Sequence, residues 1–122
     1  MKRSVDNYEA MLGFSLLGDL VEDPVQKANI AFLSMGGGAL LELVNPTTDD
    51  SPLTRFAGTG GGLHHLCYEV DDIELALNNA REHGAVIVCP PVPAIAINNR
   101  LVAFIYTRER QLIEFLAMEI AP

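Results

Sequence analysis

The feature that most constrains the fold of this chain is an internal repeat, whose two copies lie 72 residues apart. Each copy consists of an apolar segment, a short glycine-rich or polar turn and a second apolar segment, a pattern typical of a β-hairpin. The copies align without a gap, residues 30–33, 36–38 and 40–44 matching residues 102–105, 108–110 and 112–116. A fixed period of this kind indicates a structural unit that is built twice.

A helix and a strand are predicted ahead of each hairpin. In the second copy, Asp71 or Asp72 can cap a helix that continues to about Glu82, with Gly84 just beyond its end. In the first copy, the helix is expected to begin near Ser4 and to end at Gly13. The apolar faces comprise Val5, Tyr8 and Leu12 in one helix and Ile73, Ala76, Leu77 and Ala80 in the other. The apolar segments after the two glycines, residues 14–20 and 85–89, are predicted to be strands.

The second copy has a further strand, predicted at residues 63–70 after a run of three glycines. Its order of elements is therefore βαβββ. The position equivalent to His65 in the first copy falls before Met1, so the first copy is expected to lack this strand. We predict an α+β fold in which two tandem βαβββ modules form a cupped mixed sheet, the first module lacking its opening strand.

The two modules are expected to form one domain over residues 1–122, because this length is close to that of a common single domain. Module one covers about residues 1–50, and module two covers about residues 60–122. The missing strand is expected to leave one sheet edge without a partner.

Composition and charge exclude several classes of protein. Hydrophobic residues make up 49% of the chain and charged residues 20%, which is typical of a soluble globular protein. No apolar run is long enough to span a bilayer, and no signal peptide is evident. The net charge of −8 and the scattered basic residues argue against nucleic acid as a partner. With only two cysteines, Cys67 and Cys89, a reducing and therefore cytoplasmic location is expected.

Two glutamates occupy equivalent positions of the repeat. Glu42 and Glu114 each lie in mid-strand with apolar residues on both sides. A single strand glutamate more often faces water, but a buried carboxylate needs a partner, and two at equivalent positions favour a shared site. With the imidazole of His65 they would form an incomplete site for Mn²⁺, Fe²⁺, Co²⁺, Ni²⁺ or Zn²⁺, leaving positions open for water or substrate.

Two adjacent histidines follow the glycine run. Because neighbouring strand residues point to opposite faces, His64 and His65 are not expected to bind one ion together. His65 is predicted to be the ligand, and His64 to lie behind the site or at the surface. A lone strand histidine is more often structural, but the glycines favour the functional interpretation because they allow a close approach of the backbone.

These features together resemble a known family. The paired βαβββ modules and the stretches at residues 41–46, 60–72 and 112–115 look like the vicinal-oxygen-chelate superfamily. That superfamily contains glyoxalase I, methylmalonyl-CoA epimerase, extradiol dioxygenases and the bleomycin- and fosfomycin-resistance proteins. Residues 50–52, after the first hairpin, and residues 91–93, before the last one, resemble the sequences of methylmalonyl-CoA epimerase-like members. The resemblance covers nearly the whole chain and is more specific for fold than for activity.

The resemblance implies a divalent metal ion bound by Glu42, His65 and Glu114, and we predict Glu114 as the catalytic residue. The fourth ligand of the family would lie on the missing strand. The epimerases also carry an acid–base glutamate on the strand leading into the first hairpin, where the nearest residue here is Gln26. An amide has no proton to exchange at neutral pH, so epimerisation by two bases is not expected.

Three functions remain open at this point. The first is a metal-dependent lyase or isomerase that acts on a small oxygen-rich substrate through an enolate-like intermediate. The second is a non-catalytic protein that binds or sequesters a small molecule, as bleomycin-resistance proteins do. The third is a degenerate member without activity.

Two further expectations concern ligand and partner. The loop at residues 92–100 is expected to line the pocket, with Asn98, Asn99 and Arg100 as substrate contacts, although ordinary strand packing explains its apolar residues equally well. Family members commonly form dimers, and a homodimer would cover the open sheet edge.

Overall fold

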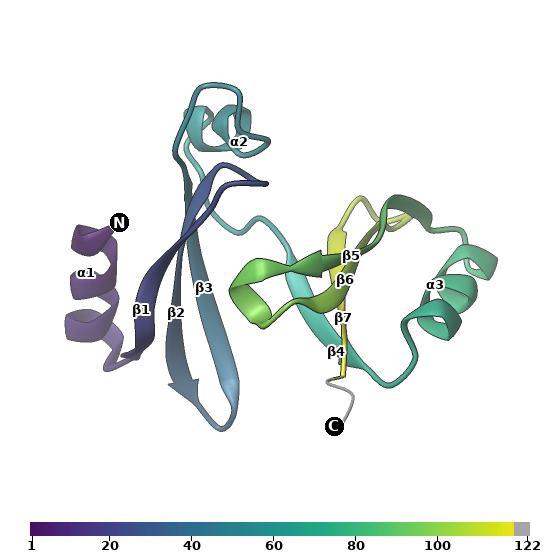
Figure 1. The fold of residues 1–122 in the computed structure, drawn as a ribbon, viewed down its shortest axis with the longest axis horizontal. Helices are drawn as coiled ribbons and strands as arrows, with labels where there is room; N and C mark the ends of the chain where they lie inside the picture. The colour runs from purple at the N-terminus through teal and green to yellow at the C-terminus, as the bar shows by residue number, and fades with distance from the viewer. Residues whose placement is uncertain (119–122) are drawn as a thin grey trace. The chain divides into compact units, whose positions relative to one another are not determined.

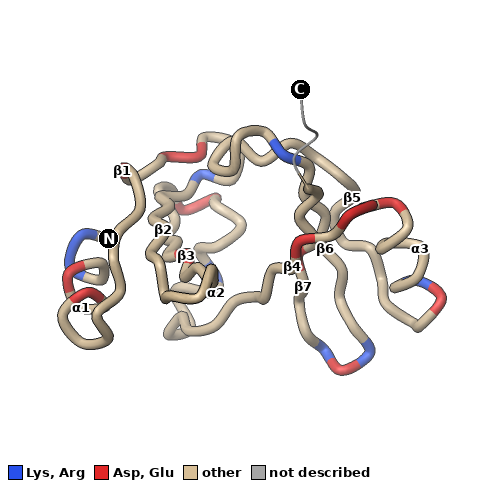
Figure 2. The backbone as a smooth tube through the Cα atoms, turned by 90° about the horizontal axis from the view of Figure 1, so that it is seen from below, with Lys and Arg blue, Asp and Glu red and all other residues tan. Residues whose placement is uncertain are grey.

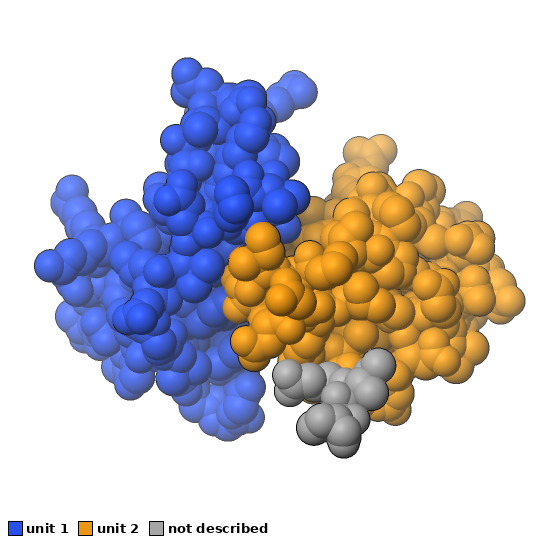
Figure 3. Space-filling view, in the orientation of Figure 1, with its two compact units in different colours: residues 1–62 blue, residues 63–122 orange. Residues whose placement is uncertain are grey.

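Figure 1 shows the computed structural model of this chain, which describes residues 1–118. Contacts divide the chain into two compact units, Met1–Gly62 and Leu63–Pro122, which are coloured separately in Figure 3. Each unit combines a helix with its own β-sheet, so the predicted α+β class is confirmed. The boundary between the units lies at the end of the glycine run that separates the two sequence repeats.

The first unit is a helix followed by three antiparallel strands. Its elements are α1 (Lys2–Leu12), β1 (Ser15–Asp23), β2 (Ala28–Gly36), β3 (Ala39–Pro46) and the short α2 (Thr54–Gly58), with strand order β1-β2-β3. Helix α1 ends at Gly13, whose φ of 71° places it in the left-handed region and whose N–H donates to the Glu9 carbonyl. A glycine closes this helix because residues with a Cβ are strained in that conformation.

The second unit holds the complete βαβββ order that the sequence predicted. Its elements are β4 (Leu66–Val70), α3 (Ile73–Glu82), β5 (Val86–Ala94), a 3-10 turn (Ile95–Ile97), β6 (Arg100–Tyr106) and β7 (Leu112–Ala117). The strand order is β4-β7-β6-β5, with β4 parallel to β7 and the other pairs antiparallel, so this sheet is mixed. Asp72 caps α3, its side chain accepting a hydrogen bond from the Leu75 N–H at 3.0 Å.

The strand registers confirm the repeat. Phe32 pairs with Glu42 across β2 and β3, and Phe104 pairs with Glu114 across β6 and β7. The two hydrophobic cores correspond in the same way, Val5, Ala31 and Leu33 in the first unit matching Leu77, Ala103 and Ile105 in the second. The same offset therefore relates the sequence, the hydrogen-bonded register and the packing.

The first unit lacks a counterpart of β4 within its described residues, as the repeat predicted. In the second unit, β4 pairs with β7 in parallel. The equivalent edge of the first sheet belongs to β3, and no other strand of the described chain pairs with it.

The predicted ends of β5 and β1 were wrong. Strand β5 does not stop near Cys89 but continues to Ala94 through three prolines. It lies at the edge of the sheet, where a residue without an N–H is tolerated, and its register with β6 shifts on both sides of Cys89. Strand β1 also runs beyond the predicted end, to Asp23, past an irregularity between Leu17 and Val21.

Lys and Arg residues are scattered along both units and do not gather on one element, as Figure 2 shows. This distribution agrees with the overall charge of −8. In residues 1–118, none of the helices has the length and apolar character needed to cross a bilayer.

Candidate functional site

The structure brings together two of the three predicted metal ligands. Nε2 of His65 lies 3.0 Å from Oε1 of Glu114, and the two side chains are only 16% and 10% exposed. The two residues are 49 positions apart in the chain and meet because β4 and β7 are neighbouring strands. A polar pair with so little exposure is held together by the low local dielectric as well as by the hydrogen bond itself.

Strand alternation explains why Glu114 points away from α3. Its neighbours Ile113 and Phe115 pack against the core beneath that helix, so the side chain between them emerges on the opposite face. On this face Glu114 is in register with Phe104 of β6 and Cys67 of β4. The carboxylate is therefore placed at the centre of the sheet, with an aromatic residue on one side.

The imidazole of His65 is fixed by two rings. The ring of Phe104 meets it edge to face, with centroids 5.2 Å apart and an interplanar angle of 75°. The ring of His64 also meets it at a steep angle, and the two Nδ1 atoms lie 2.9 Å apart. Both ring nitrogens of His65 are thus within hydrogen-bond distance of a partner.

The contact between the two histidines corrects the prediction that alternation separates them. Strand β4 begins only at Leu66, so His64 and His65 precede it and their side chains need not point to opposite faces. Burial, and secondarily the charge of His65, lowers the pKa of His64. A lowered pKa favours the neutral ring, which has one nitrogen able to accept a hydrogen bond.

Glu42 lies at the equivalent position on β3, opposite Phe32, and its side chain is half-buried. It belongs to the first unit, whereas His65 and Glu114 belong to the second. Its participation in a common site therefore stays a prediction.

The predicted substrate contacts lie at the turn before β6. Asn98 and Asn99 are exposed and adopt left-handed backbone conformations, with φ of 54° and 61°. Arg100 is half-buried, and its guanidinium donates to the Ala117 carbonyl at 2.9 Å and to Glu69 at 2.6 Å. Arg100 thus links β6 to both β7 and β4, a structural role that sequence reasoning did not foresee.

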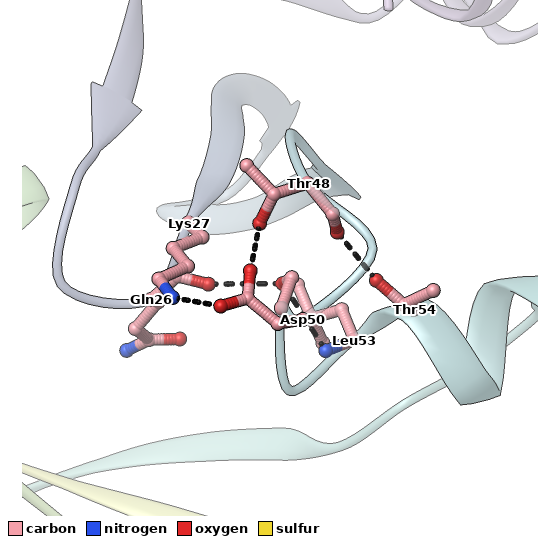
Figure 4. Close-up of polar contacts among 7 residues, drawn as sticks. Gln26, Lys27, Thr48, Asp50, Leu53 and Thr54 are labelled. Atoms are coloured by element: carbon pink, nitrogen blue, oxygen red, sulfur yellow. Dashed lines mark hydrogen bonds and ion pairs between the residues drawn. The ribbon is translucent and has the colours of Figure 1, made fainter.

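Gln26 is exposed in the turn between β1 and β2. Its backbone carbonyl accepts a hydrogen bond from the Ser51 hydroxyl at 3.0 Å, and beside it Lys27 pairs with Asp50, as Figure 4 shows. Hydrogen bonds from Lys27 and Thr48 lower the pKa of Asp50. The main chain at Gln26 thus helps to anchor the segment that follows β3, and its amide side chain supplies no exchangeable acid or base.

The donors present suit part of a metal site. The described residues contain no group of three or more histidine, cysteine or carboxylate side chains placed to hold one ion. The spacing of His65 and Glu114 nevertheless fits two adjacent ligands, because donors about 2.1 Å from an ion and at right angles to one another are about 3.0 Å apart. An imidazole and a carboxylate are ligands that Mn²⁺, Fe²⁺, Co²⁺, Ni²⁺ and Zn²⁺ all accept.

Two residues of the site were missed in the sequence. Strand alternation over residues 63–70 predicts that His64 points away from the site, but the strand begins only at Leu66. Phe104 lies within an apolar segment of the sequence, and a phenylalanine, Phe32, stands at the equivalent position in the other copy. The hairpin register would have placed each phenylalanine beside its glutamate.

Comparisons with known proteins agree with this architecture. The chain is 27% identical over 111 residues to the ethylmalonyl-CoA/methylmalonyl-CoA epimerase of Cereibacter sphaeroides, covering 89% of this chain and 81% of that protein. It spans less than two thirds of the length of the mitochondrial methylmalonyl-CoA epimerases that it matches.

Solved structures show the same fold. A hypothetical protein from Bacillus halodurans C-125 superposes with a TM-score of 0.87 at 29% identity, covering 100% of this chain and 88% of the other. Methylmalonyl-CoA epimerase from Mycobacterium tuberculosis has a TM-score of 0.83 at 22% identity, covering 98% and 81%. The family model of the Glyoxalase/Bleomycin resistance protein/Dioxygenase superfamily matches residues 1–104 of this chain. The chain therefore belongs to the Glyoxalase/Bleomycin resistance protein/Dioxygenase superfamily.

Proposed function

We propose that this protein is a metal-dependent lyase or isomerase that moves a proton on a small oxygen-rich substrate. The observation that carries the proposal is the largely buried pair of His65 and Glu114, whose Nε2 and Oε1 atoms lie 3.0 Å apart on the sheet face opposite α3. The similarity to an ethylmalonyl-CoA/methylmalonyl-CoA epimerase supports a substrate with an acidic C–H beside a carbonyl group.

In this proposal, His65 and Glu114 hold a divalent metal ion, and Glu42 is the third protein ligand. A bound divalent ion would polarise a substrate oxygen and stabilise negative charge that develops on it. The T-shaped contact with Phe104 keeps the His65 ring oriented. Asn98 and Asn99, which are exposed, and Arg100 are proposed to contact the substrate.

Glu114 is proposed to accept the proton. A carboxylate has two oxygens, so one can face His65 or the ion while the other takes a proton from substrate carbon. Gln26 cannot act as a second base, because an amide does not titrate in this range. The proposed chemistry therefore uses one carboxylate, which suits a lyase or an isomerase that returns the proton from the same group.

The proposal is tested by metal content and isotope exchange on the wild-type chain. Protein purified without chelator is expected to carry a divalent metal ion in stoichiometric amount, as measured by plasma mass spectrometry. With methylmalonyl-CoA as the probe in D₂O, proton NMR is expected to show loss of the C2 proton signal. Absence of stoichiometric metal after reconstitution with Zn²⁺, Co²⁺ and Mn²⁺ would remove the enzymatic proposal.

A second candidate function is small-molecule binding without catalysis. Gln26 favours it, because the one position that resembles an acid–base glutamate holds a group with no acid–base chemistry. Metal uptake without proton exchange on acyl-CoA or keto-acid probes would support this candidate over the enzyme.

We also propose that the protein acts as a homodimer. The outer edge of β3 has no strand partner within residues 1–118, and exposed strand edges are commonly covered in native assemblies. Light scattering coupled to size exclusion is expected to give twice the chain mass of 13.2 kDa. A single species at the chain mass at micromolar concentration would contradict the dimer.

A further inference from the structure

We propose that His64 is a positioning residue that holds His65 in the tautomer and orientation required of a metal ligand. This inference rests on the proposed function, because it assigns a role to His64 only through an ion bound at His65. The carrying observation is the 2.9 Å contact between the two Nδ1 atoms, on the side of the His65 ring away from Glu114.

The two facing Nδ1 atoms of His64 and His65 can hold one hydrogen between them. A neutral imidazole has one N–H donor and one bare acceptor nitrogen. Two Nδ1 atoms at hydrogen-bond distance therefore share a single hydrogen, so one histidine donates and the other accepts. The direction of this bond reports the tautomer of His65.

On the opposite side of the His65 ring, Nε2 faces Oε1 of Glu114. A carboxylate can only accept a hydrogen bond, so in the tautomer of His65 that donates to Glu114 the ring hydrogen is on Nε2. Nδ1 of His65 is then bare and accepts from Nδ1 of His64. When Nε2 serves as a ligand instead, it must be bare, and the hydrogen moves to Nδ1. His64 then becomes the acceptor.

His64 therefore suits both states of the site. It can donate to His65 in one state and accept from it in the other, because its own second nitrogen takes up the remaining hydrogen. Both rings are partly buried, so water competes weakly for this bond. Partners of this kind orient a ligating histidine and raise its basicity.

The test compares Zn²⁺ affinity, by isothermal titration, among the wild type, His64→Phe and His64→Asn. Phenylalanine fills the space of the ring but cannot hydrogen-bond, and we expect it to weaken binding about 10- to 100-fold. The asparagine amide offers both an acceptor and a donor near the position of Nδ1, so affinity should stay within about 3-fold of the wild type. His83→Asn is the matched control, because its ring lies at the end of α3 and contacts the Asn79 carbonyl.

A spectroscopic measurement on the wild-type protein tests the same inference without any variant. Long-range ¹H–¹⁵N correlation spectra should show that Zn²⁺ loading moves the His65 hydrogen from Nε2 to Nδ1, and the His64 hydrogen from Nδ1 to Nε2. Thermal unfolding of each variant identifies any that fails to fold, in which case the wild-type spectra decide the question.

The outcomes separate this inference from the function on which it rests. A wild type that binds no Zn²⁺ would overturn both. Zn²⁺ binding by the wild type with equal affinity in His64→Phe would overturn the role of His64 alone. Equal losses in His64→Phe and His64→Asn, or no change in the His64 tautomer on loading, would also overturn it.

Discussion

Replacing Glu114 with glutamine will slow proton exchange on the acyl-CoA probe by about 10²- to 10⁴-fold, the usual contribution of a positioned general base. Glutamine has nearly the same volume as glutamate but cannot take up a proton from carbon. Its amide oxygen can still accept a hydrogen bond from Nε2 of His65, so the free energy of unfolding should change by only about 1 kcal/mol. The exchange rate is measured by NMR, and stability by urea denaturation.

The matched control for this prediction is Glu109→Gln. Glu109 is exposed in the turn that leads into the same strand, five positions from Glu114. The Glu109→Gln substitution should leave both the rate of proton exchange and the free energy of unfolding unchanged. A Glu114→Gln protein that exchanges the substrate proton at the wild-type rate would show that another group is the base.

Replacing Leu77 with alanine will destabilise the second unit by about 2–5 kcal/mol. Leu77 is only 2% exposed and packs against Ala103 and Ile105 beneath α3. Removing its branched end leaves a cavity, because the surrounding sheet can relax only in part. A loss of this size is a large share of the roughly 5–15 kcal/mol that stabilises a typical domain. Urea denaturation followed by circular dichroism measures it.

Leu75 on the same helix provides the control. It is 66% exposed and lies outside the core, so Leu75→Ala should change the free energy of unfolding by no more than about 0.5 kcal/mol. The two substitutions remove the same atoms from the same helix and have the same effect on helix propensity. Equal losses of stability would contradict the assignment of the α3 core.

The fold was largely predictable because the repeat supplies long-range information that single segments lack. Glu42 and Glu114 could be assigned equivalent places from the alignment alone, and the observed registers place them opposite Phe32 and Phe104. His65 and Glu114 were grouped as ligands from their side-chain chemistry and the family resemblance, and the pairing of β4 with β7 brings them together. Period-two patterning identified the inner face of β6 and β7, because Ala103, Ile105, Ile113 and Phe115 pack in one core with residues of α3.

Other features depend on geometry that patterning does not encode. The contact of His64 with His65 arises where the chain has not yet entered β4, and the alternation rule does not apply there. The extension of β5 through its prolines depends on its being an edge strand, which is a property of the sheet. The sequence does not distinguish an Arg100 that contacts a ligand from one that links neighbouring strands. Its hydrogen bonds to Glu69 and Ala117 in the structure show that it links strands.

The parallel pairing of β4 with β7 also governs when the site can exist during folding. The first sheet joins only strands that follow one another in sequence, whereas β4 must wait for β7 at the far end of the second unit. Closing so long a segment carries an entropic cost that local hairpins avoid, and non-local pairing slows folding. His65 and Glu114 lie at the two ends of this segment, and their contact forms only when the two ends meet. A chain emerging from the ribosome would thus be able to pair the strands of its first sheet before His65 could meet Glu114.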